Sequence, residues 1–508
     1  MGVKTKVRNA NPTVAVLKRP LALAAMVAAI WVGSGSAASA ATVDDLLDRL
    51  KEKGILSDDE YQTLDKAREE EKKKPADAQP GIKFTFGGFI AAESVYRSRN
   101  QTADINSSFN GGIPFHNNPN YNLSEFRESA RQSRVSVLAE GNPNASTALK
   151  AYIESDFLGA AGTANSGESN SYTPRLRQGY MTVDRTDYGL HFLAGQSWSM
   201  LTLNKAGIQP RQEQIPLTID AQYVPGFTWT RNPQLRVVKD FSKTVWLGLS
   251  VESPQASIAG TAPANTTATN PSGPGGLLNP VGVNYSTDNA PDLVAKLAFD
   301  PGWGHYEVYG VGRNFRDRSG FANHSTYGGG AGAAMILPLL PEKKLDFQAS
   351  FLTGKGIGRY GAAQLPDATL NASGNVDPIK ETQFLLGLIA RPSEFWDIYL
   401  YYGVEKADAT YSGTTFGYGN PALNNSGCFA EAATAAAAIG APPGGCQANT
   451  SRVRQATLGN WYRFYKGSYG TAVLGLQYSY TSRETFAGVG GAPNTNENMF
   501  FTSVRMYF

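Results

Sequence analysis

The last residues of the chain, Asn498–Phe508 (NMFFTSVRMYF), alternate between apolar and polar side chains up to the terminal phenylalanine. Successive side chains of a β-strand point to opposite faces, so every second residue shares a face. Counted back from the end, one face carries Phe508, Met506, Val504, Thr502 and Phe500, and the other carries Tyr507, Arg505, Ser503 and Phe501. The stretch predicts a strand with one apolar and one polar face, and it decides the fold if the rest of the chain repeats it.

The first 41 residues have the three parts of a secretory signal peptide. Basic residues lie between Lys4 and Arg19, an apolar run follows over Leu21–Gly33 (LALAAMVAAIWVG), and Ala38–Ala40 forms a cleavage site. The apolar run is shorter than the ~20 residues that a spanning helix needs, so we expect cleavage rather than a retained anchor. Cleavage removes five basic residues and no acids, which changes the formal net charge from +3 to −2 and excludes a nucleic-acid-binding protein.

Residues 42–74 differ from the rest of the chain because they are dense in charge and in helix formers. Leu46 and Leu50 share one helical face, and Ser57 with Glu60 makes a capping box that opens a second helix. Such thin apolar stripes bury little surface alone. We therefore expect two short helices that pack as a coiled coil or bundle with copies of themselves, or on another partner. A solvated, frayed helix is the alternative.

After a linker over residues 75–81, the pattern of the C-terminal stretch repeats through residues 82–508. Segments with alternating apolar and polar side chains are separated by clusters of Gly, Pro, Asn, Ser and Asp. We predict sixteen strands, which begin near Ile82, Gln132, Thr147, Leu176, Gly189, Phe227, Lys243, Leu293, His305, Tyr327, Lys344, Thr382, Trp396, Arg454, Gly470 and Met499.

Charged residues recur in the middle of these strands, opposite Leu, Val and Phe. Soluble β-domains rarely exceed ~250 residues. A closed barrel in a membrane instead sets the apolar face against hydrocarbon and the charged face around a watery lumen, and it leaves no strand edge unpaired. The sequence therefore predicts an all-β fold, a transmembrane antiparallel β-barrel of about 16 strands with a short N-terminal helical extension.

The connections between the predicted strands alternate in length. Short ones such as EGNPNAS and DRTDYG are typical of periplasmic turns, and long ones are typical of extracellular loops. Aromatic residues gather beside the short turns, as a girdle at the membrane interface requires. They are Phe299, Trp303, Phe395, Trp396, Trp461, Tyr462 and Tyr465.

The signal peptide, the terminal Phe508 and the Tyr- and Gly-rich strands resemble those of Gram-negative outer-membrane porins. The helical extension VDDLLDRLKEKGILSDDEYQTL, the stretch GQSWS (Gly195–Ser199) and the stretch RNPQLR (Arg231–Arg236) are more specific. Together they resemble the DcaP-like trimeric porins, which are relatives of the phosphate-selective porins.

This resemblance implies a homotrimer of sixteen-stranded barrels in the Gram-negative outer membrane, in contact with lipid and lipopolysaccharide. It implies that the N-terminal helices lie in the periplasm and help the chain to trimerise. It also implies uptake of small anions such as dicarboxylates, and a role for Phe508 as a signal that the barrel-assembly machinery reads.

A porin needs a constriction whose size and charge favour some solutes. Residues 200–226 show no clean alternation, and we expect this segment to fold inward and to narrow the pore with Lys205 and Arg211; a trimer contact or surface loop is the alternative. By strand parity the lumen carries Arg134, Lys150, Arg236, Lys296, Arg313 and Arg505, while Arg131, Arg177 and Arg231 lie near strand ends. Arginine presents a planar fork that matches a carboxylate or phosphate, but each of these residues could instead pair with an acid of the lumen.

Two cysteines, Cys428 and Cys446, bracket an Ala-rich stretch in a long loop. Exported chains meet oxidising conditions, so we predict a disulfide, and we expect the Ala-rich stretch to form a short helix. The His residues are scattered and no catalytic motif is present, so we expect no metal, no cofactor and no enzyme. The rival interpretations are an outer-membrane barrel enzyme, an adhesin, a non-selective porin and a soluble secreted β-protein.

Overall fold

The computed structural model describes residues 81–159, 173–220, 223–260, 263, 266–271, 284–431 and 446–508. The chain divides into two compact units, Met1–Ala78 and Gln79–Phe508, and the described residues belong to the second. The expected signal peptide, the expected helices of residues 42–74, the linker before Gly81 and most of the Ala-rich stretch lie outside the described residues. Within the described part, no helix is long and apolar enough to cross a membrane.

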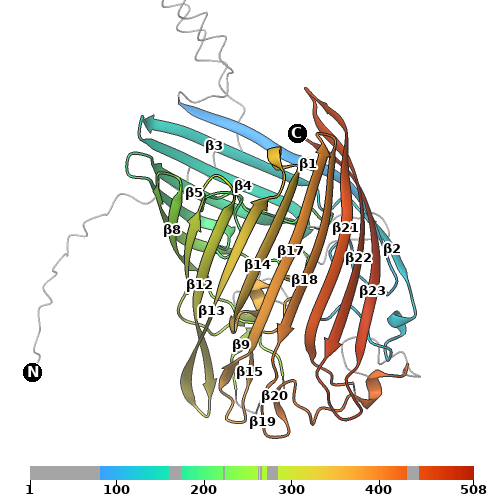
Figure 1. Cartoon of the computed structure of the whole chain (residues 1–508). Coiled ribbons are helices and arrows are strands. Elements are labelled where there is room, and N and C mark those ends of the chain that lie inside the picture. Colours follow the sequence, from blue (N-terminus) through green and yellow to red (C-terminus); the bar gives the residue numbers. More distant parts are fainter. Residues whose placement is uncertain are drawn as a thin grey trace, which may run out of the picture. The chain divides into compact units, whose positions relative to one another are not determined.

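Among the described residues, seventeen strands form one antiparallel sheet (Figure 1). In chain order they are β1 (Ile82–Arg97), β2 (Glu125–Ser129), β3 (Arg134–Asn144), β4 (Thr147–Gly159), β5 (Thr173–Arg185), β6 (Leu190–Trp198), β7 (Arg231–Phe241), β8 (Val245–Glu252), β11 (Asp292–Phe299), β12 (His305–Ser319), β13 (Ala322–Pro338), β14 (Leu345–Lys355), β17 (Lys380–Ser393), β18 (Trp396–Ala407), β21 (Thr450–Gly467), β22 (Gly470–Thr485) and β23 (Asn494–Tyr507).

Smaller elements lie in the connections. Three two-stranded sheets pair β9 (Thr269–Pro271) with β10 (Asn284–Ser286), β15 (Ala368–Leu370) with β16 (Val376–Pro378), and β19 (Thr410–Ser412) with β20 (Phe416–Tyr418). The described 3₁₀ turns are η2 (Pro119–Tyr121), η4 (Pro341–Lys343), η5 (Gly358–Tyr360) and η6 (Ser426–Cys428). Cys428 and Cys446 are joined by a disulfide that links the two ends of the Ala-rich stretch.

The sheet closes on itself because β1 pairs with the last strand, β23, on one side and with β3 and then β2 on the other. Ile82–Phe89 of β1 pair with β3, and Glu93–Arg97 pair with β2, so β2 and β3 are two pieces of one interrupted barrel strand. The result is a closed antiparallel barrel of 16 strands, which confirms the predicted all-β barrel; the predicted helical extension lies outside the described residues.

Four predicted strand starts lie four or five residues from the observed ones, namely Phe227 for β7, Tyr327 for β13, Arg454 for β21 and Met499 for β23. Phe227 lies four residues before β7 and is buried in the preceding connection. Tyr327 lies inside β13, which begins earlier because Gly320 and Phe321 make a two-residue hairpin turn after β12. Both turn residues have positive φ, as such turns require, but the second is a phenylalanine rather than Gly or Asn, so the usual sequence signal is missing. The interruption between β2 and β3 was also not predicted.

Along the barrel strands, inward and outward residues alternate. In β8, Leu247, Leu249 and Val251 are exposed on the outer surface, whereas Trp246, Ser250 and Glu252 are buried. Exposed Leu, Val, Ile and Phe recur in the same way on the other strands. An apolar surface of this extent would be costly in water and fits the hydrocarbon of a membrane.

The short connections predicted from the sequence, such as EGNPNAS and DRTDYG, lie at the end of the barrel where the C-terminus lies (Figure 1). Phe299, Trp303, Phe395 and Trp396 are exposed there, as a girdle requires. Trp461 was wrongly placed in the girdle. Its inward position follows from the alternation of β21, and its indole N–H donates to the Leu217 carbonyl inside the barrel at 2.6 Å.

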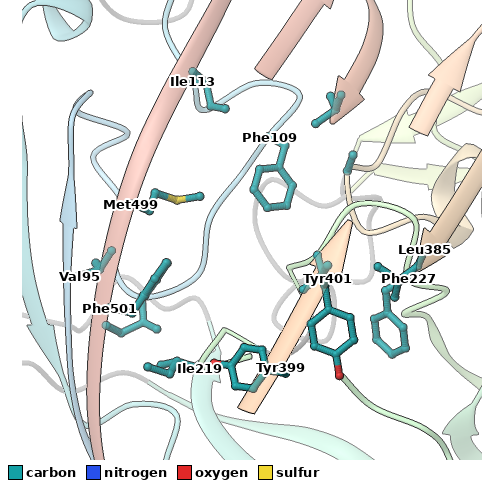
Figure 2. Packing of buried hydrophobic residues seen from close by; sticks show 14 of the residues in the cluster. Val95, Phe109, Ile113, Ile219, Phe227, Leu385, Tyr399, Tyr401, Met499 and Phe501 are labelled. Atoms are coloured by element: carbon teal, nitrogen blue, oxygen red, sulfur yellow. The ribbon is translucent and has the colours of Figure 1, made fainter. Parts of the chain in front are cut away.

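The interior is partly filled by an apolar cluster (Figure 2). Strand residues such as Tyr399, Tyr401 and Phe501 meet residues from three long connections, among them Phe109, Ile113, Ile219, Phe227 and Leu365. All of these side chains are buried. These long connections, which lie at the end opposite the short ones, therefore fold into the barrel and pack there.

Glu93 of β1 stabilises the place where the barrel closes, between β1 and β23. Its carboxylate is buried and accepts hydrogen bonds from Arg505 (2.6 and 2.8 Å), from the Ser503 hydroxyl (3.0 Å) and from the Gln132 amide (2.5 Å). These donors come from β23 and from the segment between β2 and β3. One carboxylate thus ties the last strand to the interrupted strand beside β1.

We expect Glu93→Ala to destabilise the barrel by about 3–5 kcal/mol, because it leaves the Arg505 guanidinium buried without its partner. The measurement is the temperature at which the folded protein changes mobility in detergent gels. The double variant Glu93→Leu/Arg505→Met should recover much of the loss, and Glu394→Ala, in the exposed pair with Lys466, should change little. Equal melting of Glu93→Ala and the wild type would contradict this role.

Candidate functional site

Residues 199–220 and 223–230, between β6 and β7, lie inside the barrel, and we call them the inner loop. Donors of the inner loop bond to inward-facing side chains around the wall at 2.6–3.2 Å. These are Glu252 of β8, Glu307 of β12, Gln348 of β14, Tyr401 of β18 and Gln477 of β22. The loop can cross the interior because its Met200, Leu201, Ile208 and Ile219 are buried there. These hydrogen bonds anchor the inner loop to the part of the wall that runs from β8 through β12, β14 and β18 to β22.

The start of the inner loop is held by His305. Its two ring nitrogens lie 2.7 Å from the Asp300 carboxylate and 3.0 Å from the Glu307 carboxylate. Because both nitrogens face acceptors, this arrangement suits the doubly protonated imidazolium. The same carboxylates accept backbone N–H groups of the inner loop, from Gly207 (2.9 Å) and Asn204 (3.0 Å).

Three of the predicted channel-lining residues are enclosed by partners. Lys296 is 1% exposed and donates to Glu307 (2.7 Å) and to the Thr202 carbonyl (2.7 Å). Arg313 donates to Asp292 (3.1 Å) and Asp367 (2.6 Å), and Arg505 donates to Glu93 and to the Ile219 carbonyl. These cations face inward as parity predicted, but they fasten connections to the wall instead of facing open space.

Lys150, Arg211 and Arg236 meet at one cavity of about 260 Å³, which we call the lumen cavity. It lies between the tip of the inner loop and the inner faces of β3–β7, and Tyr180, Thr182, Asp184 and His191 also line it. His191, which sequence reasoning did not single out, lies 2.9 Å from Asp184 and 3.0 Å from Asp240. Lys205 is exposed on the inner loop and does not line this cavity.

The three cations of the lumen cavity differ in how they are held. Lys150 pairs with Asp184 (3.1 Å), and Arg236 is buried and donates to the Trp198 carbonyl (2.7 Å). Arg211 is exposed, forms no ion pair among the described residues, and lies over the Tyr152 ring at 5.6 Å. The inner loop presents Arg211 with φ +65°, a conformation that is unfavourable for a residue with a side chain.

Above the lumen cavity, toward the long connections, lies the arginine row, formed by Arg134, Arg175, Arg177 and Arg231. It faces two carboxylates: Arg177 donates to Glu154 (2.5 Å) and Asp156 (2.7 Å), and Arg175 donates to Asp156 (2.8 and 3.0 Å). The Nε atom of Arg134 is buried without a hydrogen-bond partner in the described part of the chain. The row therefore places more positive than negative charge along one wall.

A β-bulge explains why sequence reasoning missed Arg175 and could not place Arg177. The pairing of β4 with β5 shifts between Glu154 and Ser155, so that Arg177 and Gln178 are both buried although they are consecutive. A bulge changes which residues of a strand face inward. The lumen is therefore faced both by Arg175 and Arg177, up to the bulge, and by Tyr180 and Thr182, which follow it.

Two acids of the inner loop have pKa values above their usual range because they are buried. Burial raises the pKa of Asp220 to about 6 and raises the pKa of Glu213 above its usual value. The Gln477 amide donates to Asp220 at 3.0 Å and partly offsets the effect. Among the described residues, no group of His, Cys, Asp and Glu is placed to hold a metal ion.

We expect His305→Leu to loosen the start of the inner loop, because Asp300 and Glu307 then face each other without the imidazolium between them. Hydrogen exchange of residues 200–207 in the folded, detergent-solubilised protein measures this, and their protection should fall. His116→Gln, at an exposed ring that packs on Tyr121, serves as the control. Unchanged protection in His305→Leu would mean that the backbone contacts alone hold the loop.

No protein-family model matches the chain, and no curated protein matches it. Among solved structures, the outer membrane channel DcaP of Acinetobacter baumannii matches with a TM-score of 0.60 and 16% identity, over 85% of this chain and 99% of that one. OprB of Pseudomonas putida matches with a TM-score of 0.46 and 11% identity, over 84% of this chain and 94% of that one. The anion-selective porin from Comamonas acidovorans matches with a TM-score of 0.43 and 10% identity, over 84% of this chain and 100% of that one.

The two short motifs that carried the resemblance lie at the base of the inner loop. Gly195–Trp198 end β6 and lead into the loop, and Arg231–Arg236 begin β7 where the loop leaves the interior. Trp198 and Arg231 face each other across the strand pair, and the Arg231 guanidinium lies over the Trp198 ring at 4.8 Å. In its closed 16-stranded barrel, the chain has the fold of the DcaP-like outer-membrane porins.

Proposed function

We propose that the protein is an outer-membrane porin that passes small hydrophilic anions, including dicarboxylates, along the β3–β7 side of its lumen. The observation that carries this proposal is the wall formed by the arginine row and Arg211, opposite the side on which the inner loop is anchored. Positive charge along a narrow polar passage favours anions over cations.

The inner loop supports the proposal by taking up space on one side of the lumen. Its anchors lie on β8, β12, β14, β18 and β22, and these strands also carry buried apolar side chains such as Trp246, Leu352 and Tyr401. Along β3–β7 the inner faces carry polar and charged side chains beside the apolar Leu138, Leu193 and Val238. We infer that the inner loop narrows the pore and leaves the path of solutes along this wall.

The balance of charge along the wall supports anions as the solutes. Four arginines of the row face the two carboxylates Glu154 and Asp156, and Arg211 adds a cation without an ion pair among the described residues. Some interior acids elsewhere are paired with a cation, as Glu93 is with Arg505 and Glu307 is with Lys296. The wall is thus more positive than the nearly balanced composition of the chain suggests.

The proposal includes the assembly that the sequence resemblance implies. The apolar outer surface suits contact with lipid, lipopolysaccharide and two further copies of the chain in a homotrimer. Phe508, which is exposed at the end of β23, remains available to the barrel-assembly machinery. The expected N-terminal helices would then lie in the periplasm, where they would trimerise or bind another partner.

In planar bilayers we expect conductance in three steps and a reversal potential that shows anion selectivity in a salt gradient. Arg134→Gln and Arg211→Gln should each lower the ratio of anion to cation permeability, because each removes a cation from the polar wall. Arg318→Gln, at an exposed position on the hairpin of β12 and β13, is the matched control. A cation-selective wild type would refute the proposal, and unchanged selectivity in both variants would refute this wall as its basis.

Acidification should increase the anion selectivity of the wild type. Asp220, with a pKa of about 6, is mostly ionised at pH 7.5 and mostly protonated at pH 5, so a negative charge disappears from the interior as the pH falls through this range. Asp220→Asn should be more anion-selective at pH 7.5 and should lose this part of the pH dependence. The same pH dependence in the wild type and the variant would assign it to other groups, such as His191.

A further inference from the structure

The lumen cavity carries hydroxyl groups that the passage of ions does not require. Tyr180 and Thr182 line it and are 7% and 5% exposed. The hydroxyl oxygens of both residues are buried without a hydrogen-bond partner among the described residues. Burying a hydroxyl without a partner costs free energy, so these two oxygens are available to bond with a molecule that enters the cavity.

These hydroxyls lie in the same cavity as the exposed cation of the inner loop. Tyr180 and Tyr152 have ring centroids 5.5 Å apart, and Arg211 lies over the Tyr152 ring. The backbone of Arg211 has the unfavourable φ of +65°. Strained backbone conformations are frequent at binding sites, because the surrounding structure holds them for the sake of the side chain they present.

We infer that the lumen cavity is a saturable binding site for a small carboxylate that also carries a hydroxyl group. The carboxylate would bond to Arg211, and the ligand hydroxyl, which both donates and accepts, would bond to Tyr180 and Thr182. At ~30 Å³ for each water-sized group, the cavity of about 260 Å³ holds on the order of nine non-hydrogen atoms. This inference rests on the proposed function in that the solute must enter the lumen.

Malate and succinate test the inference because they have the same carbon chain and charge and differ by one hydroxyl. The measurement is the concentration of each that half-saturates the reduction of the chloride current through the intact protein in bilayers. We expect malate to half-saturate at a concentration about three- to tenfold lower, which is the contribution of one neutral hydrogen bond. Equal values for the two probes in the wild type would overturn the inference.

Variants locate the effect. Tyr180→Phe and Thr182→Val each remove a hydroxyl with little change of shape, and we expect the preference for malate to fall in each and to vanish in the double variant. Tyr478→Phe, at an outward-facing tyrosine of β22, should keep the preference. A double variant that is folded and still prefers malate would overturn the inference.

Failure of this inference can be distinguished from failure of the proposed function. If the wild type is anion-selective but binds malate and succinate equally, the proposed function stands and the hydroxyl site does not. If the protein conducts without anion selectivity, calorimetric titration of the detergent-solubilised protein with both probes still measures the site. A malate preference there supports the inference, and its absence overturns it.

Discussion

The structure depends on the requirement that every backbone N–H and C=O group in hydrocarbon be bonded within the protein. A sheet meets this requirement only when it closes, because an open edge would leave a row of unpaired groups in contact with lipid. Here closure takes place between β1 and β23, from Phe89 paired with Tyr507 to Arg97 paired with Met499. The alternation in the last residues of the chain is thus the pattern of the strand that completes the barrel.

Closure creates an interior that has to be filled with bonded polar groups, and this sets a second constraint. The inward faces carry many carboxylates, and in a confined space each requires a cation or several N–H donors. The inner loop meets part of this need, since its backbone N–H groups bond to the carboxylates of Glu252, Glu307 and Glu405. The wall and the inner loop therefore stabilise each other. The interior acids hold the inner loop in place, in addition to any effect that their charge has on solutes.

Alternation was enough to predict the barrel, because it is a local property that closure imposes on every strand. All sixteen barrel strands correspond to predicted ones, and the starts at Ile82, Thr147, His305, Trp396 and Gly470 coincide with the structure. The prediction failed where the usual turn residues were missing or where a bulge shifted the alternation of inward and outward residues. The hairpin at Gly320 and Phe321 lacks the usual turn residues, and the bulge at Arg177 reverses the parity of the later residues of β5.

Which inward cations are accessible could not be predicted, because accessibility depends on contacts between segments that are distant in sequence. Sequence reasoning placed Lys296 and Arg211 alike in the interior. Lys296 is enclosed by Thr202, Asn204 and Glu307, whereas Arg211 is presented by the tip of the same loop. The position of the inner loop thus decides which cations brace the wall and which face the lumen. An anchored loop on one side leaves polar and charged side chains along the opposite side, and this asymmetry, rather than net charge, is the basis of the anion selectivity that we propose.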